Sequence, residues 1–314
     1  MPLPERPDET PVAPRGEASS DATTAAFNAS LELYEGALRR ILWVLKAYLP
    51  DIVVIGGWVP HLYMRYGGFT TWNGRLSLTA EVDVLVSSSI GTDSRPPITE
   101  LLAAEGFTPG GESTPAAVWT NAPERGERVE FLVVHEGTRA GIGDQRELPR
   151  QPKLSAISLP ELDIMGKFTR ELKVPITTDG GNEALRIRVP VLGAYVVNKA
   201  LTFPKRLRLA GDLDNPKQAK DVLYLRDLMV AGREVQDAIR ADLQEIAARS
   251  VEPFTLSTAL NNIDGLLRGP LRPIIAEVAE ALVQRDGVES VEAARADVEG
   301  YLSDLREDIT EIVS

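Results

Sequence analysis

Two short stretches decide the fold of this 314-residue chain: IVVIGGWVPHLYMRYGG at residues 52–68 and EVDVLV at residues 81–86. In the first, a β-branched run ends at two glycines, which predicts a buried strand and a tight turn. The following WVPHLYMRY predicts a short helix that stops at Gly67 and Gly68. In the second stretch, apolar and acidic residues alternate, as in a strand with two different faces. A strand, a turn and a helix followed by another strand predict a mixed α/β layer.

The flanking segments extend this layer. Apolar residues recur at helical steps between residues 23 and 49, and PITELLAAEGF at 97–107 predicts a crossover helix. RVEFLVV at 128–134 predicts a third strand, and LRIRVP at 185–190 predicts another short one. Residues 137–160 are rich in Gly, Pro and charge, which predicts a loop or an irregular edge.

The second half of the chain predicts helices. VLGAYVVNKALTF at 191–203 and AKDVLYLRDLMVAG at 219–232 each predict one helix, and the basic stretch PKRLRLAGDLDNPKQ between them predicts a loop. Further helices follow, with breaks near Pro253, Pro270 and Gly287.

We therefore predict an α+β fold, in which a mixed sheet flanked by helices is followed by an all-helical C-terminal bundle. Residues 1–22 contain five prolines and few large apolar residues, so we expect a disordered tail there. Residues 23–190 would form the α/β domain and residues 191–314 the helical C-terminal domain.

Composition excludes several classes of function. Cysteine is absent, which excludes disulfide scaffolds, thiolate catalysis and Cys-based zinc sites. Two histidines, His61 and His135, are too few for a His-rich metal centre. No apolar run approaches the roughly 20 residues that span a bilayer, and the N-terminal MPLPERPDETP lacks the features of a secretory signal. We expect a soluble, cytoplasmic protein that has no membrane partner.

The charge is unevenly distributed along the chain. The formal net charge of −12 argues against electrostatic wrapping of nucleic acid by the whole surface. Residues 139–220, however, carry 15 basic and 9 acidic residues between two acidic flanks. A local positive patch of this kind can bind phosphates, and a solvated lysine-rich surface is the alternative.

Glu81 and Asp83 are the candidate metal ligands. Residues two apart on a strand point the same way and lie about 6–7 Å apart along the backbone. This spacing lets both carboxylates hold a pair of divalent cations, which lie about 3.5–4 Å apart in two-metal sites. Glu130 on the next predicted strand is placed to add a third carboxylate, and Mg²⁺ prefers such oxygen ligands. The alternative is an acidic strand edge that faces water.

Gly56 and Gly57 form the candidate phosphate-binding turn. They place backbone amides at the N-terminus of a helix, where an anion is favoured, although a plain turn would use the same residues. For the neighbouring His61, Trp58 and Trp72, core packing is the expectation, with a ligand or base-stacking role as the alternative.

The order of these motifs resembles a known fold. A glycine pair, a helix, a loop and a Glu-x-Asp strand, followed by an acidic strand, resemble the nucleotidyltransferase fold of the DNA polymerase β superfamily. Lys199 lies one predicted helix ahead of Lys220 and Asp221, with the basic stretch between them. This arrangement is similar to that of AbiEii-type toxin nucleotidyltransferases, including the MenT-like toxins of type IV toxin–antitoxin systems. The resemblance covers roughly residues 50–230.

The resemblance implies a role for each motif. The glycine pair would cradle the triphosphate of an NTP, and the acidic pair with Glu130 would bind two Mg²⁺ ions. Lys199 matches the lysine that contacts the nucleotide phosphates, and Asp221 matches the aspartate of the last motif. With Asp83, these two residues form the expected catalytic set.

Three features depart from the family pattern. Glu81 stands where Asp is commoner, and Trp58 stands where the wider superfamily often has Ser. The gap between the glycines and Glu81 is longer than in minimal members and contains Arg75.

The implied activity is Mg²⁺-dependent transfer of a nucleoside monophosphate from an NTP to RNA, with the 3′ end of a tRNA as the expected acceptor. The implied biological role is that of a toxin with a cognate antitoxin protein as its partner. One alternative is a nucleotidyltransferase that modifies a small cationic molecule such as an aminoglycoside, which the acidic flanks would attract. The other is an inactive binding module that keeps the fold.

Overall fold

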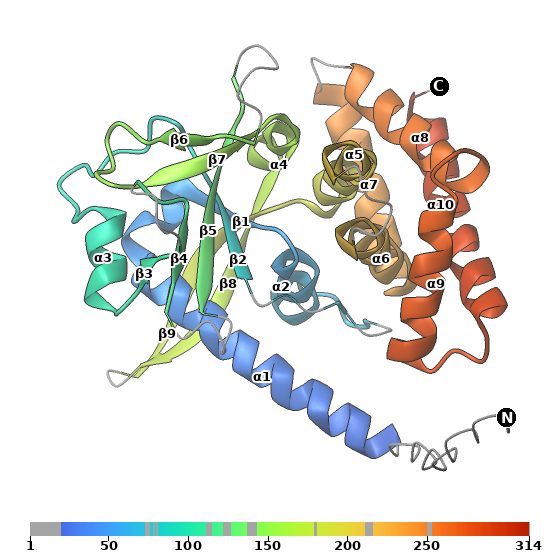
Figure 1. Ribbon diagram of the computed structural model, residues 1–314, viewed down its shortest axis with the longest axis horizontal. Helices are drawn as coiled ribbons and strands as arrows, with labels where there is room; N and C mark the ends of the chain where they lie inside the picture. The colour runs from blue at the N-terminus through green and yellow to red at the C-terminus, as the bar shows by residue number, and fades with distance from the viewer. Residues whose placement is uncertain are drawn as a thin grey trace, which may run out of the picture.

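The computed structural model describes residues 20–72, 76–77, 79, 81–110, 115–121, 127–136, 143–178, 181–210, 216–249 and 253–313. Up to Pro190, strands and helices are mixed, and the elements described after that residue are all helices (Figure 1). This arrangement confirms the predicted α+β class. The proposed domain boundaries at residues 23, 190 and 191 remain a prediction.

Seven strands of the described residues form one mixed sheet. They are β1 (Ile52–Ile55), β2 (Glu81–Val86), β3 (Thr108–Pro109), β4 (Val118–Thr120), β5 (Arg128–Val134), β6 (Gln145–Glu147) and β7 (Ser155–Leu159). The order is β1-β2-β5-β4-β3, and β7 pairs with β5 beyond the end of β4 and with β6 on its other side. Strands β2 and β5 are parallel, and their register places Asp83 opposite Glu130.

Of the two alternatives predicted for residues 137–160, a loop or an irregular edge, the loop is wrong in part, and β6 and β7 form an edge of the sheet among the described residues. Residues 137–142 lie outside the described residues, but strands β6 and β7 both form between residues 143 and 160. Strand β7 has the sequence SAISL, which is too short to show a period on its own. Its pairing with the buried strand β5 stabilises a strand that the local pattern does not indicate.

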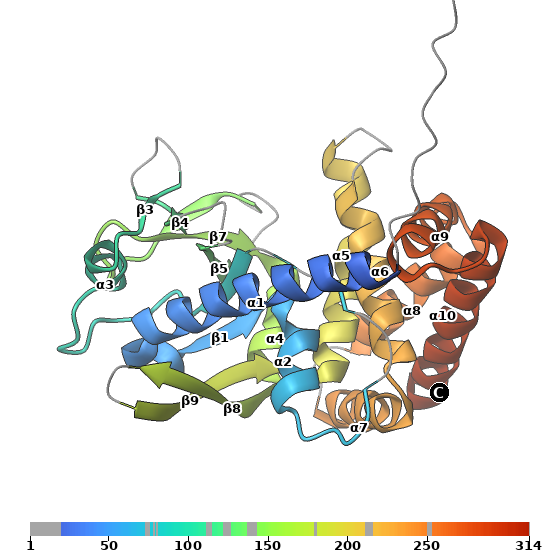
Figure 2. The same cartoon turned by 90° about the horizontal axis from the view of Figure 1, so that it is seen from below.

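A hairpin of β8 (Thr169–Thr178) and β9 (Gly181–Pro190) forms a second sheet. It packs against β1 and against the 3₁₀ helix η1 (Lys46–Asp51) (Figure 2). The short strand predicted at 185–190 is therefore the second half of a ten-residue strand, and β8 had no predicted counterpart. Exposed and buried residues alternate in β8, as in any half-buried strand. However, Pro175 lies within β8, and a proline in a sequence argues against predicting a strand there.

Four α-helices accompany the sheet: α1 (Ser20–Val44), α2 (Trp58–Tyr66), α3 (Ile98–Ala104) and α4 (Asp163–Lys167), the last of which follows the 3₁₀ helix η3 (Pro160–Leu162). The predicted first helix extends to residue 49, but α1 ends at Val44. The chain then forms the 3₁₀ helix η1 before β1 begins at Ile52. Residues 1–19 of the expected tail lie outside the described residues, and α1 begins at Ser20.

The helical part consists of α5 (Leu192–Ala210), α6 (Pro216–Val230), α7 (Arg233–Arg249), α8 (Pro253–Arg268), α9 (Pro273–Asp286) and α10 (Val291–Val313). Helix α5 continues through Pro204 to Ala210, so the predicted basic loop is wrong over those residues. Leu, Lys and Arg are good helix formers, which favours this continuation. The basic side chains of residues 205–210, and residues 211–215 entirely, lie outside the described part of the chain. No described helix is both long enough and apolar enough to cross a membrane.

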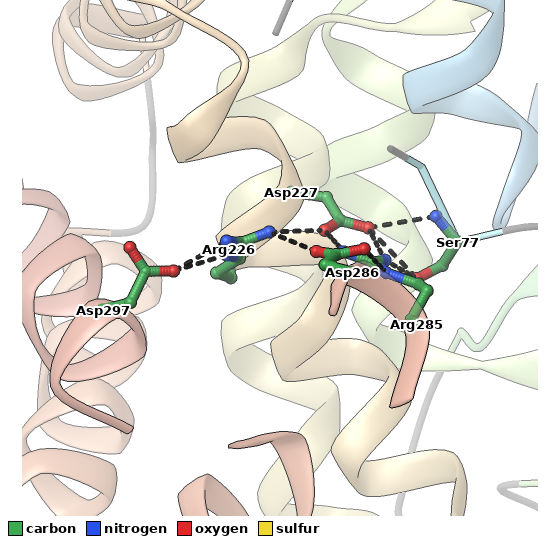
Figure 3. A network of polar contacts seen from close by, with 6 residues as sticks. All are labelled: Ser77, Arg226, Asp227, Arg285, Asp286 and Asp297. Carbon is green, nitrogen blue, oxygen red and sulfur yellow. Dashed lines mark hydrogen bonds and ion pairs between the residues drawn. The ribbon is translucent and has the colours of Figure 1, made fainter. Parts of the chain in front are cut away.

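A buried ionic network fixes α6 within the helical part (Figure 3). Asp227 on α6 has no exposed surface and accepts two hydrogen bonds of 2.7 Å from Arg285 on α9. The same carboxylate accepts hydrogen bonds from the backbone N–H and the hydroxyl of Ser77, at 3.0 and 3.1 Å. Arg226 extends the network to Asp286 and, on α10, to Asp297. The network therefore joins three helices to the segment that leads into β2.

We predict that Asp227→Ala lowers the free energy of unfolding by about 3 kcal/mol, because the largely buried Arg285 guanidinium then keeps only Asp286 as a carboxylate partner. Urea denaturation followed by circular dichroism measures the loss. Asp304→Ala on the exposed side of α10 is the control and should change stability by less than about 0.5 kcal/mol. Equal stabilities for the two variants would show that the network contributes little.

Candidate active site

A cavity of about 190 Å³ lies where β1, β2 and β5 meet α5 and α6. Acidic side chains of the strands form one part of its lining, and lysines of the two helices form another. The glycine turn after β1 adds bare backbone. The glycine turn and the two helices come from segments more than 100 residues apart, so the cavity depends on how the sheet and the helical part pack together.

The acidic part of the lining contains Glu81, Asp83 and Glu130. Asp83 is half-buried, and its Oδ1 atom is buried with no hydrogen-bond partner among the described residues. Burial, followed by the nearby charges of Glu81 and Glu130, raises the pKa of Asp83 to about 7. Glu81 forms an ion pair of 3.4 Å with Arg128. These three acidic side chains thus concentrate negative charge at one wall of the cavity.

Both positions of the glycine turn exclude a side chain. Gly56 has a φ of +73°, and a Cβ atom there would lie 1.8 Å from Oδ2 of Asp83. At Gly57, a Cβ atom would lie 2.2 Å from the hydroxyl oxygen of Tyr224 on α6. Strand β2 and helix α6 therefore both approach the turn so closely that only glycine fits at these two positions.

Lys199 and Asp221 form a buried ion pair between α5 and α6. The Lys199 Nζ donates to Oδ1 of Asp221 at 2.7 Å, and the Thr202 hydroxyl donates to Oδ2 at 3.3 Å. The Lys199 ammonium lies 5.1 Å from the centre of the Tyr224 ring, and that of Lys220 lies 5.7 Å from it. Burial lowers the pKa of Lys220, while the carboxylate of Glu81 opposes that shift. Two cations thus line the cavity together with the carboxylates.

The structure brings all of the predicted site residues to this one cavity: Gly56, Gly57, Glu81, Asp83, Glu130, Lys199 and Asp221. Arg75 lies outside the described residues. His61 is buried, and its Nε2 lies 2.8 Å from Oε1 of Glu35, as expected for a packed histidine. Trp58 and Trp72 pack against the apolar core.

Sequence reasoning assigned no role to several lining residues, of which Lys220 and Tyr224 carry the most chemistry. Residues three and four apart share one face of a helix. Lys220 and Asp221 on one turn and Tyr224 on the next fit this rule, so the helical spacing could have indicated Tyr224. Nothing local indicated that this face of α6 meets the glycine turn.

The carboxylates of Glu81, Asp83 and Glu130 are of the chemical type that binds a hard cation such as Mg²⁺. The three carboxylates supply oxygen ligands, and the unpartnered Oδ1 of Asp83 is an acceptor for which the described residues supply no donor. Within the described ranges, no group of three or more His, Cys, Asp or Glu residues stands in a metal-ligating arrangement. The ion pair of Glu81 with Arg128 is consistent with this finding, because it engages one of the three carboxylates.

We predict that Asp83→Asn stabilises the protein in the presence of EDTA. A pKa of about 7 in the folded state, above the ordinary value of 3.8, means that the folded state binds more protons than the unfolded state between about pH 4 and pH 7. Stability from this group is therefore present at pH 4 and is lost as the pH rises through 7. The variant should match the wild type at pH 4 and exceed it at pH 8, by at most about 4 kcal/mol.

Urea denaturation at the two pH values tests this, with Asp144→Asn as the control for removal of an exposed carboxylate. A variant that is no more stable than wild type at pH 8 would show that Asp83 is not electrostatically strained.

Comparison with known proteins agrees with the geometry. Residues 37–248, about two thirds of the chain, match the model of a family described as nucleotidyltransferase. The matched range contains every residue that lines the cavity. No curated protein and no solved structure matches the chain. Because the family match covers more than half of its length, the chain belongs to this nucleotidyltransferase family and is a transferase.

Proposed function

We propose that the protein transfers a nucleoside monophosphate from an NTP to an RNA acceptor in a Mg²⁺-dependent reaction, with the 3′ end of a tRNA as the acceptor site. One observation supports the location: Asp83 and Glu130 share a cavity with Lys199, Lys220 and a glycine turn. Carboxylates suit the cations that accompany a triphosphate, and the lysines and backbone amides suit its phosphates.

In this reaction, the oxygen of the acceptor hydroxyl forms a bond to the α-phosphorus of the NTP, and the proton of that hydroxyl is released to solvent. The bond from that phosphorus to the bridging oxygen breaks, and pyrophosphate leaves with the electron pair. Lys199, Lys220 and the amides of the glycine turn would stabilise the negative charge that moves onto the leaving group. Asp221 would hold Lys199 in place through the 2.7 Å ion pair.

Glu81, Asp83 and Glu130 are the residues that would hold Mg²⁺. When bound, the ions supply charge neutralisation at the phosphates and a lower pKa for the acceptor hydroxyl. The raised pKa of Asp83, which burial and then the charges of Glu81 and Glu130 cause, supports this assignment, because a bound cation would stabilise the ionised carboxylate.

The RNA acceptor and the toxin role are supported by the motif order. The glycine pair, the Glu-x-Asp strand, Lys199 and the Lys220–Asp221 pair follow one another as in AbiEii-type and MenT-like toxins. The excess of basic residues between 139 and 220 is suited to an RNA backbone. A toxin of this type would have a cognate antitoxin protein as its partner. The acidic flanks favour the second candidate, a small polycationic acceptor such as an aminoglycoside.

The test is incubation of the purified protein with each α-labelled NTP, MgCl₂, and either total tRNA or a panel of aminoglycosides. We expect label in tRNA, loss of the label with EDTA, and loss of the label in Asp83→Ala. Removal of the label by treatment with a 3′ exonuclease would place the added nucleotide at the 3′ end.

Label in an aminoglycoside would support the second candidate and contradict the RNA acceptor. Absence of label in any acceptor, with folded protein confirmed by circular dichroism, would favour a binding module without activity.

We further predict that Lys199→Ala and Asp221→Ala act as one unit. Each should lower the transfer rate at saturating NTP by about 10²–10³, because each removes charge stabilisation at the triphosphate. The double variant should lose little more than either single variant, because residues that act together are non-additive. Steady-state transfer of label measures all three.

Lys173→Ala, which removes an exposed lysine on β8, is the control and should retain the wild-type rate. Additive losses would indicate two independent roles. A wild-type rate for Lys199→Ala would indicate that this lysine only packs against the core.

A further inference from the structure

The Tyr224 hydroxyl lies against the glycine turn in the wall of the cavity. The side chain is 2% exposed, and its oxygen is so close to Gly57 that a Cβ atom there would be 2.2 Å away. This oxygen is buried, and no described residue donates to it or accepts from it. A buried hydroxyl without a partner is unfavourable, so it is a group that a ligand can satisfy.

Tyr224 is one of two cavity-lining residues with such an atom. Six buried side-chain atoms of the described residues lack a hydrogen-bond partner, and those of cavity-lining residues are the Tyr224 hydroxyl and Oδ1 of Asp83. The ionised carboxylate can only accept, whereas the phenol has a proton to donate. Burial raises the pKa of Tyr224 above its ordinary value, so it keeps this proton at neutral pH.

Charges of both signs surround Tyr224, and the carboxylates of Asp221, Asp83, Asp227 and Glu81 add to the effect of burial in raising its pKa. The ammonium groups of Lys199 and Lys220 lie 5.1 and 5.7 Å from the centre of the Tyr224 ring. The backbone of the glycine turn lies directly against the hydroxyl, at the start of helix α2. An O–H donor at the N-terminal end of a helix, on a ring with two ammonium groups nearby, is suited to a negatively charged oxygen that brings its own cations to offset the carboxylates.

We propose that the Tyr224 hydroxyl donates a hydrogen bond to a phosphate oxygen of the bound NTP, which makes Tyr224 a nucleotide-binding residue of this site. The inference rests on the proposed function, because it requires that an NTP occupies the cavity. It adds a neutral donor to the lysines and backbone amides that the motifs indicate. A phosphate contact has a distinct consequence, since it should be independent of the base.

The test is Tyr224→Phe, which keeps the aromatic ring and removes one oxygen atom. Equilibrium binding is measured by calorimetry with Mg²⁺ and α,β-methylene analogues of the four common NTPs, which prevents turnover. Loss of a hydrogen bond to a charged group should weaken binding of every analogue that binds the wild type by about 10- to 100-fold, and by the same factor for each. The melting temperature without nucleotide should not fall, because the hydroxyl has no partner among the described residues.

Tyr195→Phe is the matched control. Its hydroxyl is also buried without a partner among the described residues, and its ring packs edge-on against that of Tyr224 at 6.3 Å. Tyr195 does not line the cavity, so its substitution should leave nucleotide affinity unchanged.

Three outcomes would overturn the inference. Wild-type affinity in Tyr224→Phe would exclude the hydrogen bond while leaving the proposed function intact. A loss that differs between bases would place the hydroxyl at the base instead of the phosphates. Failure of the wild-type protein to bind any of the four analogues would overturn both this inference and the proposed function.

Discussion

The close approach of β2 and α6 at Gly56 and Gly57 is the constraint on which the candidate site depends. The Asp83 carboxylate occupies the space of a side chain at one glycine, and the Tyr224 hydroxyl occupies that space at the other. Any larger residue at either position would separate the strand from the helix. The glycine pair therefore sets the distance between the carboxylates of the sheet and the cations of the helical part.

Two groups in this site, the Asp83 carboxylate and the Tyr224 hydroxyl, are unfavourable for the stability of the fold but suited to the proposed reaction. Burial and then the neighbouring carboxylates raise the pKa of Asp83, and the buried Tyr224 hydroxyl has no partner among the described residues. Each is unfavourable without a ligand, and under the proposed function each would be satisfied by a nucleotide with its cations. The rest of the fold supplies the stability that holds them in place. Asp227 lies on α6, the helix that also contains Tyr224. Its hydrogen bonds with Arg285 and Ser77 join α6 to α9 and to the segment that precedes β2.

Sequence patterns predicted the parts of the site that lie on regular, buried elements. IVVI, EVDVLV and RVEFLVV formed strands as expected, so the carboxylates of Asp83 and Glu130 could be placed on neighbouring strands. Their exact register, and the strand β7 within a Gly- and Pro-rich segment, depend on pairing between distant residues. Tyr224 was not predicted for the same reason. Its role depends on the packing of α6 against a turn 167 residues earlier, which no local pattern reveals.

A crystal structure of the protein with Mg²⁺ and the α,β-methylene NTP analogue that it binds most tightly tests the central claim most directly. The account predicts that the triphosphate lies between the Gly56–Gly57 turn and the ammonium groups of Lys199 and Lys220. It also predicts Mg²⁺ on carboxylate oxygens of Glu81, Asp83 and Glu130. A triphosphate bound elsewhere on the molecule, with the cavity still lined by an unpartnered Asp83, would contradict it.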